Sequence, residues 1–230
     1  EAVAMRTTGL GGDSAVEMIS EGLAGGVTLG PKRVIPISLI AQDAPDVVHG
    51  ALDAQLRSTL PGEHDGRFVR AVSGQSIEGI NTREAALLER IGTALHPLGD
   101  ILRARIETGA LKRLIDRGLV QVAGVTPSDA SHALGLARAW DAEAARKALA
   151  LFGRRRTGAG DRLAPEPAAM AQMIIERLEH QTALALLETA FAEDEGGIEG
   201  DPAVLARHAL MQRGLGGHNG LVRLDTGLGV

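Results

Sequence analysis

The sequence contains no cysteine and no tyrosine, and it has only one tryptophan and three phenylalanines in 230 residues. Without cysteine the protein has no disulfide, no thiolate metal ligand and no cysteine nucleophile. Because aromatic side chains are scarce, the core must be built from leucine, isoleucine, valine and alanine, which favours helices. Hydrophobic residues make up 44% of the chain, enough for one large domain or two small ones.

Long apolar runs and an excess of positive charge are also missing. No run approaches the roughly 20 residues needed to cross a bilayer, and the amino terminus has no basic stretch followed by an apolar one. We therefore expect a soluble, cytoplasmic protein. Twenty-four basic and 29 acidic side chains give a formal net charge of -5, which opposes the counterion release that drives nucleic-acid binding.

The first informative feature that is present is a glycine-rich turn at residues 7–14, TTGLGGDS. Its glycines can reach positive φ and let backbone N–H groups approach a ligand, while Thr8, Asp13 and Ser14 offer oxygen to a cation or water. This composition is typical of a turn that faces a phosphate or a metal. The alternative is a tight connection between strands that binds nothing. Because the turn follows so soon after Glu1, which is not an initiator methionine, we expect a piece of a longer protein.

A second glycine cluster occupies residues 214–220, between a predicted helix and the apolar pair Leu221-Val222. Two such clusters suggest a cleft. The alternative for this one is an ordinary helix terminator, because glycine is the usual residue after a helix end.

Thr126, Pro127 and Asp129 predict the start of a helix, with a hydroxyl cap, a proline at the first position and an acid in the first turn. His132 would share the helical face of Asp129 and form an acid–imidazole pair with it. The alternative is a structural histidine. The seven histidines are scattered and none has a tight ligand spacing, so we predict no metal-ligating residues. The run Arg154-Arg155-Arg156 falls in a predicted loop, where solvation is a commoner reason for such charge than an anion site.

Apolar periodicity predicts strands in the first forty residues and mostly helices after them. Later strands are expected at 67–72 and 119–123, and helices at 46–60, 81–91, 97–103, 111–117, from 126 onward, and at 140–152, 167–191 and 202–213. The helix at 81 begins with a capping pair, Asn81 and Glu84. The chain divides into a strand-rich region 1–43, a helical insertion 44–124 that is similar to a winged helix, and a helical remainder 125–230.

The winged-helix order supports a competing function, a non-enzymatic module that binds DNA or another protein through residues 81–125. Residues 110–117 would be the recognition helix and 119–124 the strand of a wing. Lys112, Arg113 and Arg117 are basic, but they alternate with apolar residues as in an ordinary amphipathic helix. We therefore expect no nucleic-acid partner.

Several segments, taken in order, resemble the hydantoinase A/oxoprolinase family over nearly the whole chain. They are residues 6–14 (RTTGLGGDS), 29–36 (LGPKRVIP), 124–135 (GVTPSDASHALG), Trp140-Asp141 with Glu143-Ala144-Ala145, and 214–221 (GLGGHNGL). The resemblance implies a helix-rich α/β fold, part of the second lobe of the actin-like ATPase fold shared with sugar kinases and Hsp70, with the winged-helix-like block inserted. Members couple ATP cleavage to the opening of cyclic amides such as hydantoins or 5-oxoproline.

ATP and Mg²⁺ are the implied cofactors, and a hydantoinase B-like subunit or domain is the implied partner. The Asp-x-Gly-Gly-Thr turns that hold phosphates in this fold are absent from the sequence. They are expected upstream of Glu1, so this piece alone should be inactive. A parent enzyme related to sugar or carboxylate kinases, with the same fold and other chemistry, is a further alternative.

By position, the resemblance implies three groups of site residues: Gly11, Gly12, Asp13 and Ser14 on the phosphate or reaction side, Thr126, Ser128 and Asp129 facing the same cleft, and Gly216, Gly217 and Gly220 near the adenosine. Asp13 and Asp129 are the implied catalytic residues. Asp129 would orient a nucleophile or hold Mg²⁺ through water, and Asp13 would bind a metal or a backbone N–H. Phosphorylation of the amide oxygen would create the leaving group while the cleft excludes water.

Overall fold

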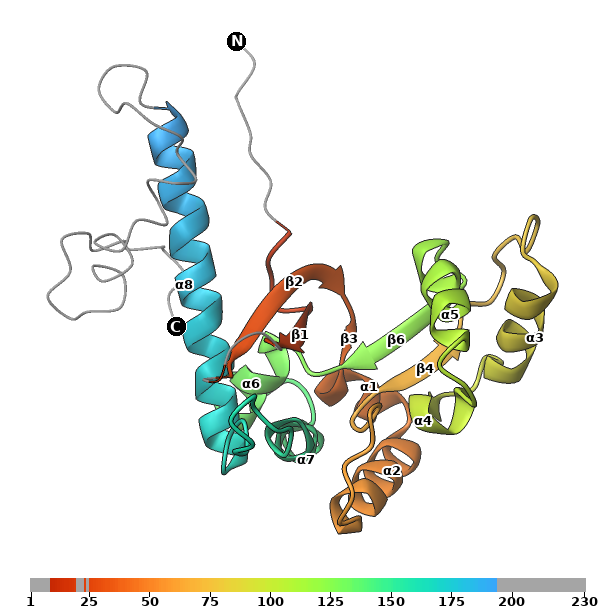
Figure 1. The fold of residues 1–230 in the computed structure, drawn as a ribbon, viewed down its shortest axis with the longest axis horizontal. Coiled ribbons are helices and arrows are strands. Elements are labelled where there is room, and N and C mark those ends of the chain that lie inside the picture. Colours follow the sequence, from red (N-terminus) through yellow and green to blue (C-terminus); the bar gives the residue numbers. More distant parts are fainter. Residues whose placement is uncertain (1–8, 20–22, 24, 194–230) are drawn as a thin grey trace, which may run out of the picture.

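The computed structural model describes residues 9–19, 23 and 25–193, and over this part of the chain it is a mixed α/β protein (Figure 1). Strands β1 (Ser14–Met18) and β2 (Val27–Arg33) pair antiparallel, which confirms two of the strands predicted in the first forty residues. The long helix α8 (Pro167–Glu193) lies along β2. The Gln181 amide accepts a hydrogen bond from the Leu29 N–H at 2.9 Å and donates to the Leu29 carbonyl at 3.1 Å, so it pairs with β2 as a neighbouring strand would.

A second sheet has the strand order β3-β6-β4-β5. Its members are β3 (Ile35–Pro36), β6 (Val120–Gly124), β4 (Phe68–Ala71) and β5 (His96–Pro97). β3 runs parallel to β6, whereas β4 is antiparallel to both of its neighbours. Successive side chains of a strand point to opposite faces. Phe68 and Ala123 accordingly pack in one hydrophobic core and Val69 and Val120 in another, so this sheet separates two cores.

Five helices surround the first core: α1 (Ile37–Asp43), α2 (Pro45–Arg57), α6 (Pro127–Ala133), α7 (Ala142–Gly153) and α8. Its buried side chains are almost all leucine, isoleucine, valine and alanine, as the composition predicts, with Phe68 and Phe152 as the aromatic members. No helix of the described residues has both the length and the apolar character needed to cross a bilayer.

The second core is formed by α3 (Thr82–Ile91), α4 (Leu98–Ile101) and α5 (Glu107–Asp116) on the other face of the sheet. The predicted order of helices followed by a strand is present. This core draws on residues between Val69 and Val122, a narrower range than the predicted insertion 44–124, because α2 packs on α7 in the first core.

In the competing interpretation, residues 119–124 are the strand of a wing, but they do not project from the protein. These residues form β6, which is hydrogen-bonded to β3 on one side and to β4 on the other. A strand paired on both edges cannot extend into a DNA groove. Arg113 is ion-paired with Glu84, and Arg117 donates to the Glu78 carbonyl, so two of the three basic side chains on the supposed recognition helix are already bound within the protein.

Two carboxylates hold the helices of the second core together. Glu84 forms the predicted capping box with Asn81 and accepts a hydrogen bond from Arg113. Glu107 accepts from Arg90 at 2.6 Å and from the Arg103 N–H at 2.7 Å. Hydrogen bonds from Arg113 and Arg90, respectively, hold the pKa of Glu84 and of Glu107 below the ordinary value of 4.5.

Carboxyl groups with lowered pKa values stabilise the folded state at pH values above 4.5, and the stabilisation is lost as the pH falls through the lowered values. We expect the free energy of unfolding to decrease over this acid range, and the decrease to be smaller in the double variant Glu84→Gln/Glu107→Gln. Urea unfolding at a series of pH values measures it. The matched control is Glu89→Gln, which changes an exposed side chain on α3 and should leave the pH dependence as it is.

Candidate functional site

The turn at residues 9–14 is closed by the side chain of Ser14. The Gly11 N–H donates to Ser14 Oγ at 2.9 Å, and the Ser14 N–H donates to the Gly11 carbonyl at 3.1 Å. Ser14 is only 1% exposed, so its hydroxyl is buried within the turn, and its cofactor-binding role stays a prediction. Gly9, Gly11 and Gly12 all have negative φ, contrary to the conformational reason predicted for them. The turn instead requires glycine at residue 12 because a side chain there would collide with Ser128.

Two backbone donors of the turn are free. Within the described part of the chain, the N–H groups of Gly12 and Asp13 have no hydrogen-bond partner. The carboxylate of Asp13 accepts two hydrogen bonds of 2.8 Å from Arg33 Nη1, and the side chains of Arg33 and Asp13 are 61% and 39% exposed. An ion pair this exposed is weak. Asp13 is therefore oriented but still accessible to a ligand.

The turn packs on the start of α6, where Thr126, Ser128 and Asp129 are found (Figure 1). The Ser128 N–H donates to the Gly12 carbonyl at 2.9 Å, and the Val16 N–H donates to the Val125 carbonyl at 3.1 Å. A Cβ atom at Gly12 would lie 2.6 Å from Ser128 Oγ. Two motifs that are far apart in the sequence are thus in direct contact, with the half-buried Ser128 hydroxyl beside the free N–H groups.

Thr126 and Asp129 are in a different situation, because both are 0% exposed. The predicted hydroxyl cap of Thr126 is present, and it forms a capping box with Asp129 at the start of α6. The Asp129 carboxylate also accepts hydrogen bonds from the Ile37 N–H at 3.1 Å, the Ser38 N–H at 2.7 Å and the Ser38 hydroxyl at 2.6 Å. One carboxylate therefore caps the first turns of α1 and α6 together.

Burial raises the pKa of Asp129, although the hydrogen bonds from Ser38, Ile37 and Thr126 favour the ionised form. Both carboxylate oxygens are occupied by protein donors. In this structure Asp129 joins two helices inside the core and does not line a cleft. Its catalytic role stays a prediction.

His132 does not pair with Asp129, so the expected acid–imidazole pair is wrong. Its Nδ1 lies 2.7 Å from the Ser128 carbonyl, and its ring stacks on Trp140 with centroids 4.9 Å apart. These contacts agree with the alternative of a structural histidine, but its Nε2 is buried without a hydrogen-bond partner among the described residues, so the ring is only partly satisfied. The spacing of four residues to Ser128 would have been the local signal for this bond.

The remaining predicted residues, Gly216, Gly217 and Gly220, and also Thr7 and Thr8, lie outside the described residues. Within the part of the chain that the structure describes, no group of three or more histidine, aspartate or glutamate side chains is placed to hold a metal ion.

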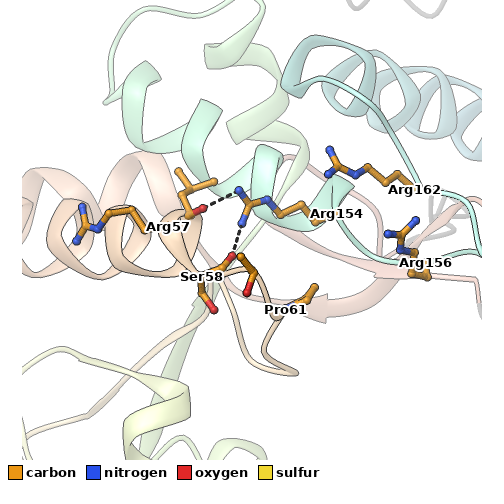
Figure 2. A pocket seen from close by; sticks show the side chains of 8 residues that line it. Arg57, Ser58, Pro61, Arg154, Arg156 and Arg162 are labelled. Atoms are coloured by element: carbon orange, nitrogen blue, oxygen red, sulfur yellow. Dashed lines mark hydrogen bonds between the residues drawn. The ribbon is translucent and has the colours of Figure 1, made fainter.

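A hollow of about 430 Å³ lies elsewhere, at the carboxyl end of α2 (Figure 2). Four arginines line it, Arg57, Arg154, Arg156 and Arg162, and none of the predicted site residues does. The signal for it in the sequence is the run Arg154-Arg155-Arg156, for which solvation is the commoner reason. Arg57 lies too far away in the sequence to have been connected with this run.

The fold and the turn define a mixed α/β protein in which a glycine-rich loop packs on the start of a capped helix. Comparison of the chain with protein-family models, with curated proteins and with solved structures found no match in any of the three.

Proposed function

We propose that the chain is part of an ATP-dependent hydrolase that opens cyclic amides of the hydantoin or 5-oxoproline type, and that it forms one wall of the nucleotide and substrate cleft. The observation that carries the proposal is the contact between Gly12 and Ser128. It joins two of the segments on which the family resemblance rests. It also places accessible donors and a carboxylate within one small region.

ATP and Mg²⁺ would contact only some of the predicted site residues. The free N–H groups of Gly12 and Asp13 suit phosphate oxygens, and the Asp13 carboxylate and the Ser128 hydroxyl are oxygen donors of the kind that Mg²⁺ and its waters prefer. Thr126 and Asp129 would act by holding the start of α6, and with it Ser128, in place. Bound ATP would supply the phosphoryl group that activates the amide oxygen.

Phosphate release from ATP by the complete protein tests the proposal, with hydantoins and 5-oxoproline as substrates and with and without the hydantoinase B-like partner. At least one cyclic amide should stimulate ATP hydrolysis and be opened. Lack of stimulation by every ring would contradict the hydrolase function. Transfer of phosphate to a sugar or a carboxylic acid would show the kinase-related alternative instead.

Replacement of Gly12 by alanine should separate stability from activity. The new Cβ would displace Ser128 Oγ, which can rotate away, so we expect less than about 1 kcal/mol of destabilisation. Turnover should fall by about tenfold or more, because the hydroxyl leaves its position. In the double variant Gly12→Ala/Ser128→Ala the clash is absent, so stability should recover while turnover does not.

The matched control is Gly50→Ala on the exposed face of α2, where an added Cβ meets nothing within 4 Å. It should stabilise the helix by about 1 kcal/mol and leave turnover unchanged. Full turnover in the Gly12→Ala variant would remove Ser128 from the proposed site.

A further inference from the structure

The hollow at the end of α2, which we call the arginine hollow, is built from three separate segments. They are the end of α2 with the loop that follows it (Leu56, Arg57, Ser58, Thr59 and Pro61), Arg154 just after α7, and the loop that carries Arg156 and Arg162. Arg156 and Arg162 are partners in an antiparallel bridge, which brings them side by side (Figure 2).

The lining of the arginine hollow is positively charged, and Asp53, which lies outside it, interacts electrostatically with Arg57. No carboxylate is among its lining residues. Within the described residues, Arg57, Arg156 and Arg162 form no ion pair, and all three are exposed. Arg156 makes one side-chain hydrogen bond, to the Gly160 carbonyl at 3.0 Å. This concentration of free guanidinium groups occurs in a chain whose formal net charge is -5.

Arg155, between the two lining arginines, adds to the local positive charge. Its guanidinium lies over the Phe152 ring, 4.1 Å from the centroid. Burial and the nearby charge of Arg67 lower the pKa of Arg155 to about 10. Three consecutive residues, 154–156, are thus arginines, and Arg162 is a fourth arginine of the same region.

Arg154 has a different task from the other three arginines. It donates to the Leu56 carbonyl at 2.7 Å and to the Ser58 carbonyl at 3.3 Å (Figure 2). It also donates to the Gln55 carbonyl at 3.3 Å, so all three acceptors belong to the last turn of α2 and its C-cap. These bonds tie the end of α2 to the end of α7. They hold one wall of the arginine hollow in position, so the site is built on two packed helices.

We propose that the arginine hollow binds a small ligand that carries phosphate groups. Guanidinium groups bind phosphate oxygens in pairs of parallel hydrogen bonds, and the neighbouring side chains of Arg156 and Arg162 suit a multiply charged anion better than a single carboxylate (Figure 2). A volume of about 430 Å³ is within the range of small-molecule sites. Leu56 and Pro61 supply apolar surface for the rest of the ligand. The proposal does not rest on the proposed hydrolase function, since no residue of the turn or of α6 lines the hollow.

Titration calorimetry with inorganic pyrophosphate as the probe tests the proposal, in a buffer without phosphate or sulfate and at physiological ionic strength. We expect one saturable site. Arg156→Gln and Arg162→Gln should each weaken pyrophosphate binding by about tenfold, and the double variant by about a hundredfold. Arg154 is left unchanged, because its loss would free the carbonyls at the end of α2.

The matched control is Arg83→Gln, an exposed arginine of α3 in the second core, which should bind pyrophosphate as the unchanged protein does. Far-ultraviolet circular dichroism and thermal unfolding show whether each variant is folded. Absence of saturable binding by the folded protein would overturn the proposal, and so would equal weakening by Arg83→Gln. Displacement of pyrophosphate by a single-stranded oligonucleotide, with an affinity that rises with its length, would assign the surface to nucleic acid instead and would also overturn it.

Discussion

Replacement of Asp129 by alanine is expected to destabilise the protein by about 3 to 5 kcal/mol. The substitution leaves the buried N–H groups of Ile37, Ser38 and Thr126 without an acceptor. Each such group loses its hydrogen bond without gaining water, because the site is closed to solvent. Urea unfolding followed by far-ultraviolet circular dichroism measures the loss.

Asparagine at this position should also be destabilising. It keeps one carbonyl oxygen, but its NH₂ group would face donors where the carboxylate now accepts from Ser38 or Thr126. The matched control is Asp46→Ala, an exposed acid in the first turn of α2, which should cost less than about 1 kcal/mol. If Asp129→Asn instead folds with unchanged stability and loses only turnover, the carboxylate is catalytic and its structural role is wrong.

The second large effect concerns the sheet between the two cores. Phe68 is 0% exposed on the face toward the first core, and we expect Phe68→Ala to cost about 3 to 5 kcal/mol through lost burial and the cavity that remains. Phe68→Leu retains much of the volume and is the matched control. Both variants are measured by urea unfolding.

Because the sheet contributes side chains to both cores, the cores should unfold together. Leu114 is fully buried in the second core, and Leu114→Ala should cost about 2 to 5 kcal/mol. Trp140, which stacks on His132 beside the first core, is the single tryptophan and reports on that side. The fluorescence transition of Trp140 should therefore move to lower urea in Leu114→Ala, together with the circular dichroism transition. A fluorescence transition that does not move would show that the two cores unfold independently.

The features that were predictable from the sequence depend on residues within one or two turns of each other. The capping boxes of Asn81 with Glu84 and of Thr126 with Asp129 are formed by residues three apart, and the apolar spacing that predicted α2, α5 and α7 repeats within each helix. Such patterns are visible in any window of the sequence.

Helix α1 shows where this reasoning fails. Residues 33–37 are predicted as a strand, but the structure divides them: Arg33 ends β2, Ile35–Pro36 form β3, and Ile37 begins α1. The helix begins at Ile37, whose N–H is bound by a carboxylate 92 residues away. The start of α1 therefore has no local hydrogen-bonding cap that the sequence could have revealed.

In the candidate site, too, some features are predictable from the local sequence and others depend on the tertiary structure. The sequence alone determined which residue types are present, a glycine-rich turn with Asp13 and a capped helix with Ser128 and Asp129, because composition and capping are local. Only the tertiary structure decided that Asp129 is buried while Asp13 stays accessible, that Gly12 contacts Ser128, and that Arg57 joins Arg156 and Arg162 around one hollow. Exposure and contacts between distant segments follow from how the helices and sheets pack, and this packing depends on the whole chain at once.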